Sequence, residues 1–353
     1  MKQVISVIMV VLLILFISSG CKNRNLSGQG KYISFTLDVE IGYGDFKFES
    51  HVYCYDLETK QLSRVGVVPD NSQYPVTAYD RSANKIYYSA SSLDDERVVH
   101  QSTDQLYVLD LNTGEAKALT NALYAINYII PTEKEVALIT WPLKSSNNSL
   151  MLYTWNKTSH DLKCLSWDED ISFWKVYYDP DTGELTASGY SSMEFLYRIG
   201  HQDETSFIQP ESTIYSINVH DGAHEDLFVI KNTNLIIQTN ILSILRKNDE
   251  IIAYTKEDIK DGYQLSHDYD IISYDLRGNK TGDYKYNKKL QGFTDFVYIS
   301  SEGRYIYYIG SIGTNGNALC SYDTFLDETN VIFESKPIPN YTHIISAIVL
   351  SDY

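Results

Sequence analysis

The sequence predicts an all-β protein, built as a β-propeller of six four-stranded blades. Three observations predict this fold: a strand-and-turn motif recurs six times, tyrosine is abundant with 30 of 353 residues, and two strands without local partners lie at opposite ends of the chain. Tyrosine favours strands because its ring packs well on a pleated, half-buried surface. No later stretch is typical of a domain boundary, so we expect one propeller domain over residues 31–353.

The recurring motif is an aromatic-rich strand that ends in Asp or Asn and is followed by a turn. In one copy, Gln105–Asp110 is followed by Leu-Asn-Thr-Gly. The six copies end at Asp56, Asp110, Asn156, Asn218, Asp275 and Asp323. Their spacing of about 50 residues is typical of propeller blades rather than of solenoids.

A second motif, two apolar runs joined by a short polar turn, lies between these copies. Residues 76–88 and 296–308 carry it, with turns at Ser82–Asn84 and Ser301–Gly303. This pattern predicts a β-hairpin. Two hairpins in each repeat supply the four strands of a blade, which we name a, b, c and d from the axis outward.

The two unpartnered strands predict how the ring closes. Residues 32–38 form a strand with no partner before it, and residues 344–350 form one with no partner after it. If the last strand is strand a of the first blade, six complete blades result and no sheet edge stays open. Seven blades are the less favoured alternative, because residues 189–212 have a poor strand pattern.

The N-terminal segment predicts export and a lipid anchor. Lys2 precedes the apolar run Val4–Ile17, and the small residues Ser18–Gly20 precede Cys21, which is the pattern of a secretory signal. The segment resembles the lipobox of bacterial lipoproteins, although Ser18 stands where that family favours Leu. The resemblance implies a signal peptide over residues 1–20 and a lipidated Cys21 as the mature N-terminus. An uncleaved membrane helix is the alternative.

We therefore expect a flexible tether over residues 21–30 and a cell-membrane location that faces outside the cytoplasm. The net charge of -17 excludes nucleic acid as a partner and electrostatic adhesion to anionic lipid. The remaining cysteines, Cys54, Cys164 and Cys320, are odd in number and lack C-x-x-C spacing. They predict buried free thiols in strands rather than disulfides or a zinc site.

One repeat resembles a known propeller family. Residues 105–120, preceded by Asn84–Ala90, resemble a blade of the TolB-like six-bladed propellers, although the Pro-Asp-Gly turn of that family is replaced by Ser82–Asn84. The resemblance implies the fold. It implies no function, because this fold serves enzymes, adhesion modules and transport accessories alike.

The blade layout predicts which face carries function. The b–c and d–a connections lie on one face, which we call the b–c face, and the a–b and c–d turns lie on the other. Long b–c connections on a rigid scaffold favour binding. We expect these connections at residues 39–50, 91–104, 142–148, 191–211, 257–268 and 311–317.

Two kinds of side chain on the b–c face could carry function. His100, His201 and His267 lie near carboxylates and are candidate metal ligands, although exposed loops commonly hold histidines and no pair shows ligand spacing. Aromatic rings near carboxylates suit sugar or peptide binding, and the alternative is that they pack the loops onto the blades. The candidate binding residues are Trp141, Trp167, Asp168, Tyr197 and Tyr263.

The strands a should line the axis of the ring with mixed, mostly small or polar side chains. The candidates are Tyr79, Asn127, Lys175, Ser243, Asp295 and Ser346. We find no hydrolase, zinc-protease, phosphate-loop or dinucleotide motif, and we expect no catalytic residue and no cofactor.

Two functional hypotheses follow. The first is a cell-surface binding or scaffold module for an envelope protein or glycan, acting through the b–c face. The alternative is an extracellular propeller enzyme, a polysaccharide lyase or hydrolase, with a metal held by the loop histidines.

Overall fold

The structure is a computed structural model that describes residues 30–41, 48–91, 103–143, 149–200, 210–232, 237–261, 264–312, 316–335 and 342–353. For residues 237–238, 258–261, 264–268 and 312 it describes the strands but not the side chains.

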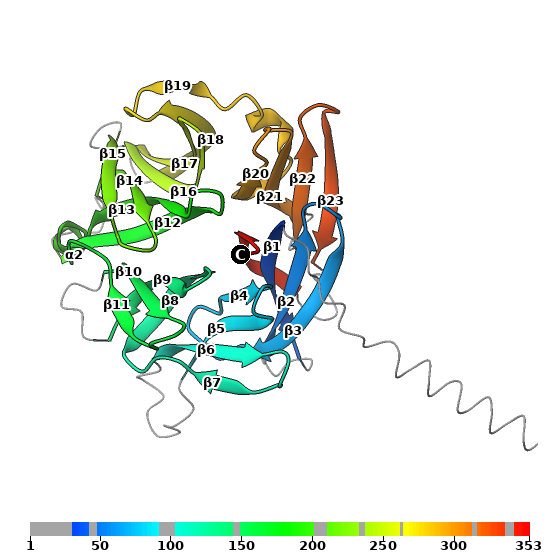
Figure 1. Cartoon of the computed structure of the whole chain (residues 1–353). Coiled ribbons are helices and arrows are strands. Elements are labelled where there is room, and N and C mark those ends of the chain that lie inside the picture. The colour runs from blue at the N-terminus through cyan, green and yellow to red at the C-terminus, as the bar shows by residue number, and fades with distance from the viewer. Residues whose placement is uncertain are drawn as a thin grey trace, which may run out of the picture.

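Six four-stranded antiparallel sheets surround a common axis (Figure 1). Blade 1 combines β24 (Thr342–Ser351), β1 (Lys31–Glu40), β2 (Phe48–Asp56) and β3 (Leu62–Pro69). Blade 2 contains β4 (Thr77–Asp80), β5 (Lys85–Ser91), β6 (Asp104–Asp110) and β7 (Ala116–Ala118). Blade 3 contains β8 (Leu123–Pro131), β9 (Glu135–Pro142), β10 (Met151–Asn156) and β11 (Leu162–Cys164).

The other three blades follow the same order. Blade 4 contains β12 (Ile171–Asp179), β13 (Glu184–Ser191), β14 (Ser212–Asn218) and β15 (His224–Ile230), and helix α2 (Ser192–Gly200) follows β13. Blade 5 contains β16 (Ile237–Lys247), β17 (Glu250–Asp261), β18 (Gln264–Asp275) and β19 (Lys280–Asp283), and the 3-10 helix η1 (Asn287–Lys289) leads onward. Blade 6 contains β20 (Phe293–Ile299), β21 (Tyr305–Ile312), β22 (Gly316–Asp323) and β23 (Glu328–Glu334).

The predicted six-bladed ring and its mode of closure are therefore confirmed. β24 pairs with β1 from Lys31↔Ser351 to Val39↔Thr342, so the last strand completes the first blade. The poorly patterned segment 189–212 forms no seventh blade, because its described part contains the end of β13, helix α2 and the start of β14.

The recurring Asp or Asn has the same local function in all six blades. Its side-chain oxygen accepts a hydrogen bond from the backbone N–H two residues later, at 2.9–3.0 Å, which forms an Asx turn between strands c and d. Each turn then ends in a residue with positive φ, which only Gly adopts without cost. These residues are Lys60, Gly114, His160, Gly222, Gly278 and Asp327.

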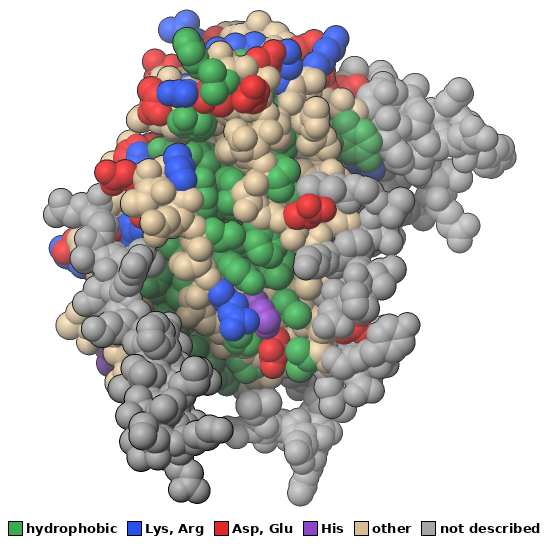
Figure 2. Space-filling model, turned by 90° about the vertical axis from the view of Figure 1, so that its right-hand side faces the viewer, with side chains coloured by type: hydrophobic (Ala, Val, Ile, Leu, Met, Phe, Trp, Pro, Cys, Tyr) green, Lys and Arg blue, Asp and Glu red, His purple; other side chains and the backbone are tan. Residues whose placement is uncertain are grey.

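Apolar side chains between successive blades form the core. One buried cluster spans blades 1 to 4, a second spans blades 4 to 6, and a third, which includes Phe35, Leu319 and Val349, joins blade 6 to blade 1. Figure 2 shows apolar side chains on the outer surface of blades 6 and 1, with acidic and basic side chains gathered above them. Val331 and Val67, on the outermost strands of these blades, are exposed.

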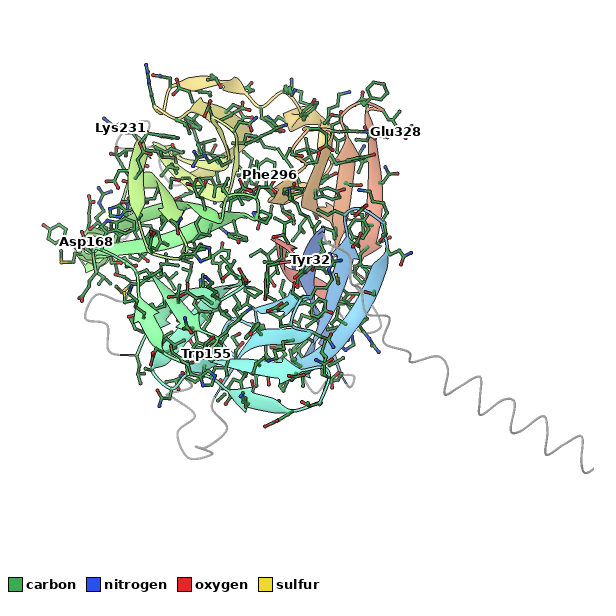
Figure 3. The ribbon with its side chains drawn as sticks, viewed as in Figure 1. Tyr32, Trp155, Asp168, Lys231, Phe296 and Glu328 are labelled. Atoms are coloured by element: carbon green, nitrogen blue, oxygen red, sulfur yellow. The ribbon has the colours of Figure 1, made fainter. Side chains whose placement is uncertain are left out.

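Blade 1 is tied to blade 2 by a buried arginine. The Arg81 side chain donates to Asp56 Oδ2 at 2.6 Å, to Asp352 Oδ1 at 2.8 Å and Oδ2 at 2.6 Å, and to the Gly30 carbonyl at 3.1 Å. Its guanidinium lies 4.4 Å from the ring centre of Tyr32, which Figure 3 labels on blade 1. We call Arg81, Asp56, Asp352, Tyr32 and the Gly30 carbonyl the closure cluster.

A second polar group links blades 2 and 3 beside the closure cluster. Lys157 Nζ donates to Asp80 Oδ2 at 2.7 Å and to the Thr132 carbonyl, and it bonds with Tyr353 OH, which also donates to Asp80. The Asp80 side chain is fully buried. Residues 352 and 353 thus join blade 1 to both following blades.

The three described cysteines are free, as expected, but the prediction that all are buried is wrong for one of them. Cys54 and Cys320 are buried, and burial raises the pKa of their thiols to about 12 and about 11. Cys164 is exposed because it lies on β11, the outermost strand of blade 3. Cys21 lies outside the described residues. Among the helices of the described chain, none has the length and apolar character needed to cross a membrane.

Candidate functional site

The b–c connections differ in form, and one expectation about them is wrong. Residues 257–268 do not form a long loop, because β17 and β18 continue as a paired ladder to Asp261↔Gln264. The connection after β13 contains helix α2. Most residues of the other b–c connections lie outside the described residues.

Helix α2 is held at its N-terminus by side chains from two segments. Asp170 Oδ1 accepts from the Met193 N–H at 2.6 Å, and Ser191 Oγ donates to Asp170 Oδ2 at 2.6 Å. Ser191 Oγ also accepts from the Glu194 N–H at 3.0 Å. A nine-residue helix is marginal on its own, so these caps fix both its existence and its position. The Ser191-x-x-Glu194 spacing is a capping-box signal that was open to sequence analysis.

Most apolar side chains of α2 face solvent, whereas Phe195 packs on Tyr190 with ring centres 5.3 Å apart. Ser192 is the buried residue of the helix, whereas four apolar side chains are 42% to 64% exposed: Met193, Leu196, Tyr197 and Ile199. Surface helices normally turn their apolar stripe to the core. The predicted binding residue Tyr197 is the most exposed of the four.

Trp167 and Asp168 lie on the connection between β11 and β12, which also contains the α2 capping residue Asp170. The Trp167 ring stacks on His224 at 3.5 Å and meets Tyr215 edge-on at 5.5 Å, so it packs against blade 4. Asp168 Oδ1 accepts from the Asp170 N–H at 2.9 Å. Figure 3 places Asp168 at the rim beside α2. The structure therefore groups Asp168, Trp167 and the helix that carries Tyr197.

The other predicted site residues are not part of this group. Trp141, at the end of β9, packs on Tyr124 with ring centres 4.7 Å apart. Tyr263, His100 and His201 lie outside the described residues, and the side chain of His267 is not described. Within the described chain, no three His, Cys, Asp or Glu side chains are grouped so that they could hold a metal ion.

Polar side chains of strands a from several blades meet at the axis. Ser243 Oγ donates to Asp295 and accepts from the Phe296 N–H at 3.0 Å. Burial raises the pKa of Asp295, and Lys175 of blade 4 acts against this shift. Burial raises the pKa of Tyr128 in blade 3, and the nearby Asp295 carboxylate raises the pKa of Tyr128 further. The predicted axial positions Lys175, Ser243 and Asp295 are thus brought together.

β-bulges shape the strands around this axial group. The ladder of β12 and β13 shifts between Phe173 and Lys175, which leaves Trp174 unpaired and 45% exposed. Comparable shifts occur in β8, β16, β20 and β24. Bulges redirect side chains and are frequent near functional sites.

Two predicted axial residues take other contacts. Tyr79 is buried and packs on Tyr32 of blade 1, so its assignment to the axis is wrong. Ser346 Oγ donates to Thr36 Oγ1 at 2.8 Å. Asn127 lies in the bulge of β8, and its buried Oδ1 has no hydrogen-bond partner within the described part of the chain.

Comparisons with known proteins find similarity of fold only. No family model and no curated protein matches the chain. Similar solved structures include TolB from Acinetobacter baumannii, with 16% identity, a TM-score of 0.49, and coverage of 91% of this chain and 67% of TolB. A chain of a nidogen–laminin complex has 11% identity, a TM-score of 0.49, and coverage of 92% of this chain and 100% of that chain.

A further match is an oligogalacturonate lyase in complex with manganese, with 11% identity, a TM-score of 0.44, and coverage of 87% of this chain and 74% of the lyase. At such identities and TM-scores, none of these proteins lends its activity to this chain.

The axial carboxylate predicts a specific pH dependence of stability. The pKa of Asp295 is raised in the folded protein, so the unfolded chain releases this proton at lower pH and stability falls as pH rises from about 4 toward the folded pKa. Asp295→Asn should remove that fall, so the variant gains stability relative to the parent with rising pH. Urea unfolding between pH 4 and pH 8 measures the difference, and a difference that does not change with pH would contradict the assignment.

Proposed function

We propose that this protein is an exported, lipid-anchored binding module whose b–c face docks a protein of the cell envelope through helix α2. The observation that carries the proposal is the exposure of four apolar side chains, at 42% to 64%, on a helix that two capping side chains hold in place. Grouped exposed apolar side chains on a soluble domain mark interaction sites.

The composition of this surface favours a protein partner over a glycan. Met193, Leu196 and Ile199 are aliphatic, and Tyr197 is the one ring among them. Aliphatic side chains pack against other apolar side chains, whereas sugars are usually bound by flat aromatic faces. The Glu194–Arg198 ion pair on the same helix offers a polar edge to such an interface.

The N-terminal segment supports the proposed location. An apolar segment followed by Ser18–Gly20 and Cys21 suits export and lipidation. Two acyl chains would anchor the protein stably. The net charge of -17 disfavours direct adhesion to anionic lipid, which leaves the propeller available to a protein partner.

The docking proposal predicts that polar substitutions in α2 abolish partner capture. Full-length protein carrying Leu196→Ser and Tyr197→Ser should lose a protein that the parent retains from envelope extract, because the substitutions remove apolar contact area. The readout is quantitative mass spectrometry of the captured proteins, with circular dichroism to verify folding.

The matched control is Phe325→Ser with Leu326→Ser, on the c–d turn of blade 6 at the opposite face. These residues are 81% and 54% exposed, so the control removes similar apolar surface elsewhere. We expect the control to retain the partner. Equal retention by the two variants, or loss in the control, would refute docking through α2.

The proposed anchor predicts that replacement of Cys21 abolishes lipidation. Cys21→Ala should lose palmitate labelling and accumulate uncleaved, because the thioether that holds the diacylglyceryl group cannot form. Cys164→Ala serves as the control, since Cys164 is an exposed free thiol of the propeller. Labelling that persists in Cys21→Ala, or that disappears in Cys164→Ala, would show that Cys21 is not the lipidated residue.

A further inference from the structure

Strand β1 presents a row of polar side chains to blade 2. The Tyr32 hydroxyl donates to the Tyr79 carbonyl, and Ser34 Oγ accepts from the Tyr79 N–H. One step further along, Thr36 Oγ1 and Thr77 Oγ1 share a hydrogen bond of 2.7 Å. Alternate residues of a strand point to the same side, so Asp38 is the next member of this row.

Asp38 meets a second carboxylate where the chain passes from blade 1 to blade 2. Its side chain contacts that of Asp70, which directly follows β3. Burial, and then Asp70, raise the pKa of Asp38 to about 8, and the Val39 N–H is the group that opposes this rise. Within the described residues, no cationic side chain contributes to this balance. Two carboxylates in contact repel each other unless a proton or a cation lies between them.

Ser50 adds a third oxygen on the same side of the blade. It lies directly opposite Asp38 in the β1–β2 ladder, and opposed residues on neighbouring strands project to the same face. Ser50 is 1% exposed, and its Oγ has no hydrogen-bond partner in the described chain. Asp38 Oδ1 is likewise buried without a partner. A buried polar atom left in this state destabilises the fold.

We propose that Asp38, Asp70 and Ser50 form a calcium site between blades 1 and 2 on the b–c face. The donors are two carboxylates and a hydroxyl, which are the hard oxygen ligands that Ca²⁺ prefers. The imidazole of His343, which lies opposite Asp38 in the β1–β24 ladder, contacts Asn317 of blade 6. Water can complete the six to eight ligands that Ca²⁺ takes, because its coordination geometry is flexible. The ion satisfies the unpaired oxygens and replaces the proton between the carboxylates.

The site is independent of docking through α2, because it uses blades 1 and 2 rather than the connection between blades 3 and 4. Its effect is on the ring itself. Asp38 belongs to β1 and Asp70 is the first residue after β3, so a bound ion fixes the start of the connection from blade 1 to blade 2 at the b–c face. The closure cluster joins the same two blades at the opposite face.

Calcium binding to the full-length protein tests the proposal directly. After treatment with EDTA and removal of the chelator, isothermal titration with CaCl₂ should show a binding event at millimolar or lower concentration, and Ca²⁺ should raise the unfolding temperature. Asp38→Asn and Asp70→Asn should each abolish both responses, and Ser50→Ala should weaken the affinity. Asp226→Asn, an exposed carboxylate on β15, is the matched control and should respond like the parent.

Two further readouts separate a cation site from a purely structural contact. In EDTA, Asp38→Asn should unfold at a higher temperature than the parent at neutral pH, because the substitution removes the repulsion between two carboxylates in contact. The Ca²⁺ affinity of the parent should fall at acidic pH, because carboxylate ligands must lose their protons to bind the ion. Absence of Ca²⁺ binding by the parent would overturn the proposal in favour of a shared proton, and so would an Asp38→Asn variant that still binds Ca²⁺.

Discussion

The guanidinium of Arg81 lies buried between Asp56 and Asp352, a residue 271 positions further along the chain. A charge in this position is costly unless every partner is in place, because removing one partner of a buried pair typically costs about 3–5 kcal/mol. Burial alone would lower the pKa of Arg81, but Asp352 and Asp56 raise it above the ordinary value. The ring can close only when β24 is paired with β1, since Asp352 directly follows β24. This closure brings blade 6 against blade 1, so that every blade has a neighbour on both sides.

Closure gives the two faces of the ring different characters. On the a–b and c–d face, ion pairs cross between blades, as where Lys31 of β1 bonds with Asp181 of blade 4 and with Tyr298 of blade 6. The b–c face carries α2, the exposed Trp174 at the axis and the Asp38–Asp70 contact. One face therefore carries these contacts between blades, and the other carries the exposed side chains of α2 and the Asp38–Asp70 contact.

The fold was predictable because each blade repeats one local rule. An Asp or Asn that ends strand c and closes the next turn is visible in the sequence, and so are the unpaired strands at residues 32–38 and 344–350. The functional sites were harder to predict from the sequence. Asp38 and Asp70 lie 32 positions apart, and the segment that follows β3 must fold back past β2 toward the end of β1 before their side chains meet. Tyr79 turns toward Tyr32 of blade 1. Periodicity identifies the strand that carries a residue, but blade packing decides what its side chain meets.

Amide hydrogen exchange across the β1–β24 ladder is the most direct test of the claim that the closure cluster holds the ring shut. Arg81→Met should accelerate exchange at residues 31–40 and 342–351 far more than in blades 4 and 5, because opening there no longer breaks a buried ion pair. The control is Arg304→Met, which removes a half-exposed arginine paired with Asp323 inside blade 6 and should leave those amides at parental rates. Uniform acceleration over all blades in Arg81→Met, or no acceleration at the ladder, would contradict this account.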